Sequence, residues 1–358
     1  MHRTIRFATN ENYNCRLQYS RIMLNRLLNR AGQAVLTVFV VVSLTFGLIR
    51  LLPGGPLDYL RAQLQQQSTG AVDSERINRL VESYTNVSPS EPIIVQYIDY
   101  MSSVLTGDFG ESIWYNNQEV SAIIARALPW TLLIMSISIL LMFILGILLG
   151  AVMAYREGGQ FDLSATGFSI LLNSVPYYVA ALVLLYLFAY QLQWFPTRGK
   201  MTSGATAGLN WPFIAGVLNH AALPILSLVI TGFGGWALSM RGNSIQVLGQ
   251  EYLRVARLRG LPERRIAVRY VGRNAILPMY TNLLIAIGFM FGGSVILEEI
   301  FTYPGIGFYL FQSINARDYP LMMGTFIVIT VAVVIGVFVA DLTYGLIDPR
   351  TKGNNESF

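Results

Sequence analysis

Six long runs of apolar residues alternate with polar segments along the chain. A transmembrane α-helix needs about 20 apolar residues to cross the hydrocarbon core of a bilayer, and each run is close to that length. Pro176, near the start of the third run, predicts a kink, because proline removes a backbone hydrogen bond. The pattern predicts an all-α integral membrane protein with six transmembrane helices. The runs are approximately residues 34–52, 131–154, 165–190, 224–240, 278–297 and 321–346.

The longest polar segment, residues 54–128, follows the first apolar run and is too long to be a simple connection. Amphipathic helices are expected at 74–84 and 92–105. The segment could be a cap that packs on the spans, a platform for an external protein, or both. One face of the second helix is expected to carry Ile94, Tyr97, Ile98 and Met101.

Composition supports the membrane class. Hydrophobic residues make up 53% of the chain and charged residues only 13%, whereas a soluble domain carries about 25% charged residues. The net charge of +5 could suggest a nucleic-acid partner, but the basic residues are concentrated in a few segments. The single cysteine, Cys15, excludes an internal disulfide framework and a Cys-based metal site. The two histidines are too few for a histidine cluster.

The distribution of charge orients the six-span layout. Seventeen Lys and Arg residues fall in segments that the layout places on one side, seven fall on the other, and Arg50 borders the first span. Basic residues accumulate on the cytoplasmic side of membrane proteins. Both termini are therefore expected in the cytoplasm, together with the segment between the fourth and fifth runs.

That segment, residues 251–278, is strongly basic, with seven arginines against two glutamates. Apolar residues recur in it at helical spacing, which predicts short amphipathic helices. Gly260 is expected to end the first helix and Pro262 to start the second. The result is a helix–turn–helix at a membrane face, basic on one side. The recurring apolar residues are Val255, Leu258 and Leu261, then Ile266 and Tyr270.

This segment resembles the cytoplasmic coupling loop, or EAA loop, of ABC importer permeases, particularly those of the oligopeptide, dipeptide and nickel family. The broader pattern has a glutamate and two alanines before the glycine, and here Arg254, Val255 and Ala256 stand at those positions. The peptide-type branch commonly shows this departure. The resemblance is carried by Tyr252, Arg254, Ala256, Arg257 and Gly260, then by Arg273, Asn274, Ala275, Leu277 and Pro278.

Other motifs in the family's order extend the resemblance over residues 23–352. In the first of them Gly55 replaces the usual acidic residue. Residues 1–22 precede the family's usual start at about Met23, so they are expected to be a disordered extension or to lie upstream of the true start. The motifs are LLPGGP at 51–56, GDFGES at 107–112, E-x-x-F-x-x-P-G-x-G at 298–307, RDYP at 317–320 and DPR at 348–350.

The resemblance implies a permease subunit in the cell membrane that pairs with a second, homologous permease, two ATPase subunits and an extracytoplasmic solute-binding protein. The layout that follows is a basic tail at 1–30, a first transmembrane helix at 31–53, an extracytoplasmic region at 54–128, a permease core at 129–347 with its coupling loop at 241–277, and a tail at 348–358.

The resemblance also implies roles for individual residues. The helix–turn–helix at 251–278 is expected to dock on the ATPase by shape, with small Ala256 facing the turn. Arg257 and Arg264 are expected to pair with acidic residues of the partner. Polar residues of the spans could line the translocation path or serve only structure: Asn173, Ser174 and Asp341. The docking residues are Tyr252, Arg254, Ala256, Arg257, Gly260, Leu261, Pro262 and Arg264, and the outer motif is Glu298, Phe301, Pro304, Gly305 and Gly307.

Motifs for catalysis do not occur in the sequence. There is no G-x-x-x-x-G-K-[ST] phosphate loop and no H-E-x-x-H, G-x-S-x-G or paired-cysteine spacing. The chain is thus expected to be no enzyme and to hold no cofactor or metal, with ATP and Mg²⁺ bound by the partner ATPases. Its other expected partner is membrane lipid rather than nucleic acid.

Peptides are the leading substrate class, and oligosaccharides and nickel stay open because the family serves all three. A secondary transporter is the alternative of another class. It would need coupling acids or broken helices at mid-membrane in corresponding halves. Only Asp341 offers itself, and it lies close to the inner end of its span. A membrane anchor, a further alternative, would not need a basic helix–turn–helix between its fourth and fifth spans.

Overall fold

The structure is a computed structural model that describes residues 28–47, 62, 79, 82, 84, 91–115 and 118–347. Expectations for the basic tail, the LLPGGP motif, a helix at 74–84 and the DPR end lie outside the described residues.

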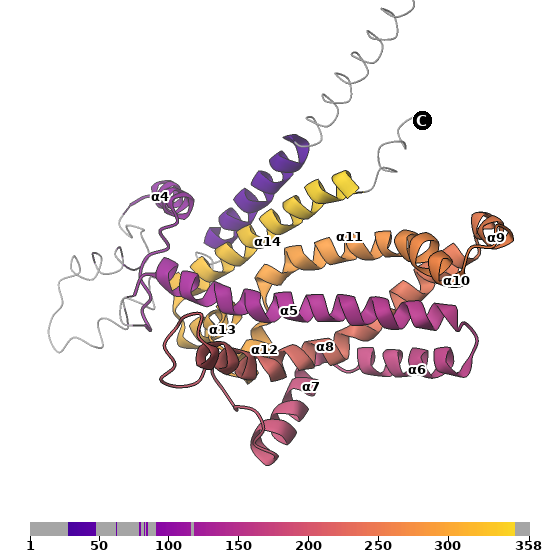
Figure 1. The fold of residues 1–358 in the computed structure, drawn as a ribbon. Helices are drawn as coiled ribbons and strands as arrows, with labels where there is room; N and C mark the ends of the chain where they lie inside the picture. The colour runs from indigo at the N-terminus through magenta and orange to yellow at the C-terminus, as the bar shows by residue number, and fades with distance from the viewer. Residues whose placement is uncertain are drawn as a thin grey trace, which may run out of the picture.

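Helices make up the regular structure of the described part, which contains no strand beyond an isolated bridge between Glu111 and Glu119. Figure 1 shows the long helices running along one another, with α9 and α10 at one end of the bundle and α4 towards the other. A first helix spans Leu28–Gly47. The others are α4 (Ile93–Thr106), α5 (Val120–Tyr155), α6 (Gln160–Ser174), α7 (Tyr177–Leu184), η1 (Leu185–Gln191), α8 (Trp211–Leu248), α9 (Glu251–Leu258), α10 (Glu263–Arg265), η2 (Ile266–Gly272), α11 (Arg273–Phe289), η3 (Met290–Gly292), α12 (Val295–Ile300), α13 (Ile306–Ala316) and α14 (Tyr319–Ile347).

Five of these helices are long and apolar enough to cross a membrane, and a bent pair makes a sixth if it is one span. The third span, expected at 165–190 with a kink at Pro176, starts earlier and is bent more sharply than a kink. Its helix begins at Gln160 and breaks at Val175–Pro176, where α6 and α7 meet at 89°. The expected proline kink is confirmed, since Pro176 has no N–H to donate and disfavours helical geometry at the residue before it.

The fourth span is longer than expected. Residues 211–219, expected in a polar loop, form the first turns of α8, because the side chain of Asn210 caps the helix by accepting from the N–H of Phe213 at 2.9 Å. Pro224 then lies inside the helix without ending it. In the same way Pro278, the expected start of the fifth span, lies inside α11. The amphipathic helix expected at 92–105 is confirmed as α4.

The centre of the bundle is the packing of α5 on α8. Gly146 and Gly150 of α5 lie against α8, where an added Cβ at Gly150 would collide with the carbonyl oxygen of Ala237. On the other side of α8, Gly234 lies against the backbone of Ser169 in α6, as its small size predicts. Because backbone faces backbone at these points, the polar ends of α6 and α8 are held at fixed positions.

Candidate functional site

The basic segment folds as the predicted helix–turn–helix. Helix α9 ends at Leu258, Gly260 adopts a φ of +72°, and Pro262 precedes α10, which continues through η2 into α11. The N–H of Gly260 donates to Arg257 O at 2.9 Å, and the N–H of Leu261 donates to Ala256 O at 3.3 Å, so the last carbonyls of α9 are paired. An added Cβ at Gly260 would meet no atom within 4 Å, and glycine is therefore needed for its backbone conformation alone.

The segment has a small hydrophobic core of its own. Leu253 and Ala256 of α9 are buried against Ile266 and Val271 of η2. Val255 and Leu258, whose spacing helped to predict the helix, lie outside this core and are 49% and 81% exposed. Two stripes of α9 are apolar, and the one at 253 and 256 faces inward. Ala256 is enclosed by the segment itself, and its expected role in letting the segment sit close to a partner stays a prediction.

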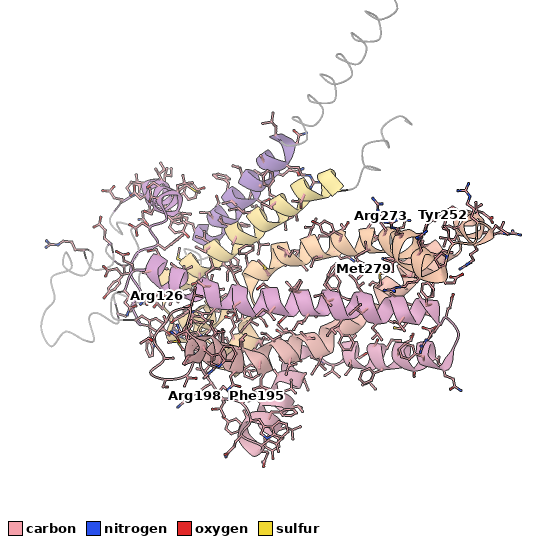
Figure 2. All side chains as sticks on the ribbon, viewed as in Figure 1. Arg126, Phe195, Arg198, Tyr252, Arg273 and Met279 are labelled. Atoms are coloured by element: carbon pink, nitrogen blue, oxygen red, sulfur yellow. The ribbon has the colours of Figure 1, made fainter. Side chains whose placement is uncertain are left out.

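The outward face of α9 carries Tyr252, Val255 and Leu258, which recur every three residues and are all exposed. Arg254 and Arg264 are exposed beside them, as is Pro262, while Leu261 is partly buried on the inner core. This apolar face with basic neighbours is called the α9 face below. Figure 2 shows Tyr252 and Arg273 at this end of the molecule, with Arg126 at the other.

Arg257 is paired within the segment. Its Nε lies 3.2 Å from Glu263 Oε1, and both side chains are about half exposed or more. An exposed pair of this kind is worth about 0.2–1 kcal/mol, so it orients Arg257 without fixing the fold. Glu263 therefore competes with any acidic residue of a partner for Arg257. Arg264, in contrast, has no ion pair among the described residues.

Asn274 ties α9 to the transmembrane helix α11. Its Nδ2 donates to the hydroxyl of Tyr252 at 3.2 Å and to Tyr270 O at 2.7 Å. Both Tyr252 and Asn274 carried the resemblance, but their contact could not be seen from their positions. Asn274 therefore connects α9 directly to the first turn of α11.

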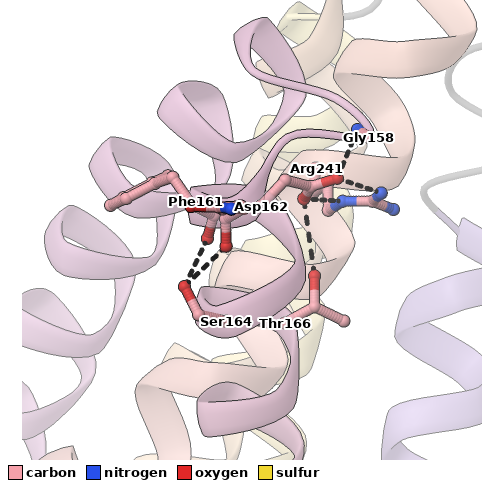
Figure 3. A network of polar contacts seen from close by, with 7 residues as sticks. Gly158, Phe161, Asp162, Ser164, Thr166 and Arg241 are labelled. Carbon is pink, nitrogen blue, oxygen red and sulfur yellow. Dashed lines mark hydrogen bonds and ion pairs between the residues drawn. The ribbon is translucent and has the colours of Figure 1, made fainter.

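A buried ion pair fixes the same end of the bundle. Asp162 at the start of α6 is 3% exposed and accepts two bonds from Arg241 of α8, to Oδ1 from Nε at 2.6 Å and to Oδ2 from Nη2 at 2.7 Å. Figure 3 shows the pair with two further donors, the N–H of Gly158 at 3.1 Å and Thr166 Oγ1 at 3.4 Å. Such charge-assisted, bidentate geometry is strong and directional. Sequence analysis placed Asp162 in a plain loop and missed the pair.

At the opposite end, the outer motif is built around Glu298, which is 2% exposed. Thr131 Oγ1 of α5 donates to Oε1 at 2.8 Å, and the N–H of Phe308 in the first turn of α13 donates to Oε2 at 3.0 Å. Thr131 Oγ1 in turn accepts from the N–H of Ile306 at 2.8 Å. The carboxyl group therefore satisfies the start of α13, where helix N–H groups lack partners. Burial raises the pKa of Glu298 to about 7.

The glycines of this motif make room for that carboxyl group. A Cβ at Gly305 would lie 2.5 Å from Glu298 Oε2, and one at Gly307 would lie 3.1 Å from the same atom. Phe301 is buried in the adjoining core cluster and Pro304 is partly buried. Most of residues 301–308 are enclosed, so this segment offers little polar surface to a partner.

A second buried acid joins two motifs that were recognised separately. Asp318 of RDYP is 1% exposed and accepts bonds from the hydroxyl of Ser112 and, at 3.1 Å, from the N–H of Trp114, both near the end of GDFGES. Its other oxygen accepts from the N–H of Leu321 at 3.3 Å and caps α14. Both motifs are thus parts of one structural junction.

The polar residues expected in the spans have ordinary surroundings. Ser174 Oγ donates to Ile170 O at 2.8 Å in its own helix, and the side chain of Asn173 lies beside Gly235. Asp341 belongs to α14, but its side chain lies outside the described residues. Within the described part there is no group of three or more His, Cys, Asp or Glu side chains that could hold a metal.

Comparison with known proteins identifies the kind of chain to which this arrangement belongs. Residues 146–353 match the family described as "Binding-protein-dependent transport system inner membrane component". The dipeptide transport system permease protein DppB of Bacillus subtilis is 32% identical over 330 residues, which is 92% of this chain and 98% of that protein. The oligopeptide transport system permease protein AppB of the same organism is 32% identical over 91% of this chain and 98% of its own length. OppB of Salmonella typhimurium is 28% identical over 92% of this chain and all of its own.

Proposed function

Because the chain belongs to the family of inner membrane components of binding-protein-dependent transport systems, we propose that it is the permease subunit of an ATP-driven importer of di- and oligopeptides. The observation that carries the proposal is the α9 face. It is an exposed apolar and basic surface that Asn274 ties to α11, at the end of the bundle where Asp162 of α6 pairs with Arg241 of α8.

The α9 face is the docking site for an ATPase subunit. Leu258 projects furthest, with 81% of its surface exposed, and an exposed apolar side chain flanked by arginines fits an apolar groove with an acidic rim. Two ATPase subunits would bind ATP and Mg²⁺, and a second, homologous permease would provide the other half of the path. In this chain the segment 241–277 serves coupling.

The orientation follows from charge. The segment 251–278 carries seven of the fourteen arginines of the described part, so we place it in the cytoplasm. Both termini then lie in the cytoplasm as well. The region around α4 and residues 107–119 faces outwards and, with residues 54–90, provides the platform for the solute-binding protein.

Peptides are the proposed substrates because the relatives that cover almost the whole chain are named for dipeptide and oligopeptide transport. Oligosaccharides or nickel would use the same machinery, and their import is the alternative. An ion-coupled secondary transporter is the alternative of another class.

Uptake by the whole complex tests the proposal. The chain is co-expressed with its partner subunits, reconstituted in liposomes and supplied with the binding protein and labelled trialanine. We expect accumulation only when ATP is present on the side of the ATPases. Accumulation driven by a proton or sodium gradient without ATP would refute the importer assignment, and ATP-driven uptake of oligosaccharides or nickel but not of peptides would refute the substrate class.

A further inference from the structure

A polar groove of about 650 Å³ lies between α8 and α11, at the end of the bundle that carries the α9 face. That volume is within the range of small-ligand sites in proteins, roughly 300–1,000 Å³. None of the lining residues is charged, although arginines are abundant nearby. They are Leu238, Ser239, Gly242, Asn243, Gln246, Asn274, Leu277, Pro278, Thr281 and Asn282.

The lining is rich in carboxamides at helical spacing. Asn243 and Gln246 stand on one stripe of α8, and Asn274 and Asn282 stand on the facing stripe of α11. The side chains of Gln246 and Asn282 are exposed in the groove, and neither has a hydrogen-bond partner among the described residues. The carbonyl of Asn274 is a further acceptor, because Pro278, four residues later in α11, has no N–H to donate the helical bond to it.

The groove is at the inner mouth of the membrane. Helix α8 has 38 residues and is therefore about 57 Å long, roughly twice the thickness of the hydrocarbon core. With Trp211 at the outer interface, Asn243 lies about 48 Å further along the helix axis, at or beyond the inner boundary of the core. A solute leaving towards the cytoplasm would pass this point.

The chemistry of the lining selects a class of ligand. A carboxamide presents both a donor and an acceptor, which matches the N–H and C=O of a peptide bond. A path for peptides of varied sequence must contact what all peptides share, and an uncharged lining favours neither acidic nor basic side chains. Neutral hydrogen bonds are also weak enough, at about 0.5–1.5 kcal/mol net, to release the solute.

Resting on the proposed function, we infer that this groove is a transit site for the peptide backbone, in which Gln246 and Asn282 hydrogen-bond the substrate's peptide bonds. The site is linked to ATPase docking through Asn274, which lines the groove and donates to Tyr252 on the α9 face.

The test compares two substrates in the reconstituted complex, trialanine and its analogue methylated at both peptide nitrogens. The double variant Gln246→Met, Asn282→Leu keeps side-chain size but removes the carboxamides. Gln191→Met, on η1 and outside the groove, is the matched control. The same binding protein is used throughout, so a change in the preference between the two substrates comes from the permease.

We expect wild type and Gln191→Met to prefer trialanine over the methylated analogue. The double variant should lose roughly tenfold of its trialanine uptake, as expected for one or two lost hydrogen bonds, and much of that preference. An unchanged preference in the double variant, with or without reduced uptake, would overturn the inference while leaving the proposed function intact.

Two other results are equally decisive. If the double variant no longer co-purified with the second permease, the groove would be a subunit interface and the inference would be wrong. If the wild-type complex imported no peptide at all, the proposed substrate class would fail and the transit site would fail with it.

Discussion

Replacement of Gly260 tests whether coupling depends on the shape of the turn after α9. The residue has a φ of +72° and open space around its Cα. The cost of a substitution therefore comes from the backbone, without a steric clash. Residues with a Cβ pay about 1–2 kcal/mol in the left-handed region, and asparagine pays least because its short polar side chain tolerates it. A β-branched side chain is the least compatible.

We expect uptake to fall in the order Gly260, Gly260→Asn, Gly260→Ala and Gly260→Val. A penalty of about 2 kcal/mol would reduce the population of the docked conformation roughly 30-fold if the turn must hold that conformation in every cycle. A Cβ at position 260 would meet no atom within 4 Å, so it would not touch the small core that α9 forms with η2. The permease should therefore still insert in the membrane.

The assay combines ATP-dependent peptide uptake, peptide-stimulated ATP hydrolysis and the amount of permease in the membrane fraction. Loss of uptake and of stimulated hydrolysis at an unchanged membrane level supports the reasoning. Normal transport by Gly260→Val would refute it, as would Gly260→Asn being as damaging as Gly260→Val, because a purely conformational requirement separates these two variants.

Three further predictions follow from the described contacts. Leu258→Asp should abolish stimulated ATP hydrolysis by placing a charge in an apolar contact, whereas Arg264→Ala should be mild; equal effects in the hydrolysis assay would contradict the docking face. With the native cysteine replaced, cysteines at the exposed positions Trp114 and Arg264 should label from opposite sides of the membrane, and labelling of both by an impermeant external reagent would exclude the six-span orientation. Because burial raises the pKa of Glu298 to about 7 from 4.5, the folded state binds a proton that the unfolded chain releases between these values, so thermal stability in detergent should fall as pH rises from about 4.5 to about 7. Glu298→Gln should lose this slope, and an identical slope in the variant would assign it to other groups.

Apolar runs predicted the membrane class and most helices, but they did not predict where helices end. Trp211 to Asn219 looks like part of a polar loop, yet Asn210 caps a helix there and Pro224 is accommodated inside it. Proline at 176 breaks its helix while proline at 224 and 278 does not. Because the residue is proline in all three places, the residue type alone does not decide whether the helix breaks. We attribute the difference to the packing of the neighbouring helices, which the local sequence pattern does not contain.

In the α9 segment, the period predicted a helix and Gly260 its end, but not which side would be buried. Leu253 and Ala256 form one apolar stripe and Val255 and Leu258 another, and both are separated by three residues. The choice depends on the approach of η2, whose Ile266 and Val271 lie further along the chain. Once the inner stripe is assigned, the exposed stripe becomes the surface that needs a partner, and the functional interpretation moves from Ala256 to Leu258.

The outer motifs were recognised by their acids and glycines, a composition that is typical of exposed turns. In the structure this motif is enclosed instead of exposed, and the glycines at 305 and 307 leave the space that the carboxyl group of Glu298 fills. Asp318 likewise reaches Ser112, a residue more than 200 positions away. Each acid replaces water as the partner of helix N–H groups, and only then can a polar segment be enclosed. Glu298 accepts from the first turn of α13 and Asp318 from the first turn of α14, the helices that follow them in the chain. Each acid also accepts from a hydroxyl group far along the sequence, that of Thr131 or of Ser112, and this second contact is the part that the local sequence pattern does not contain.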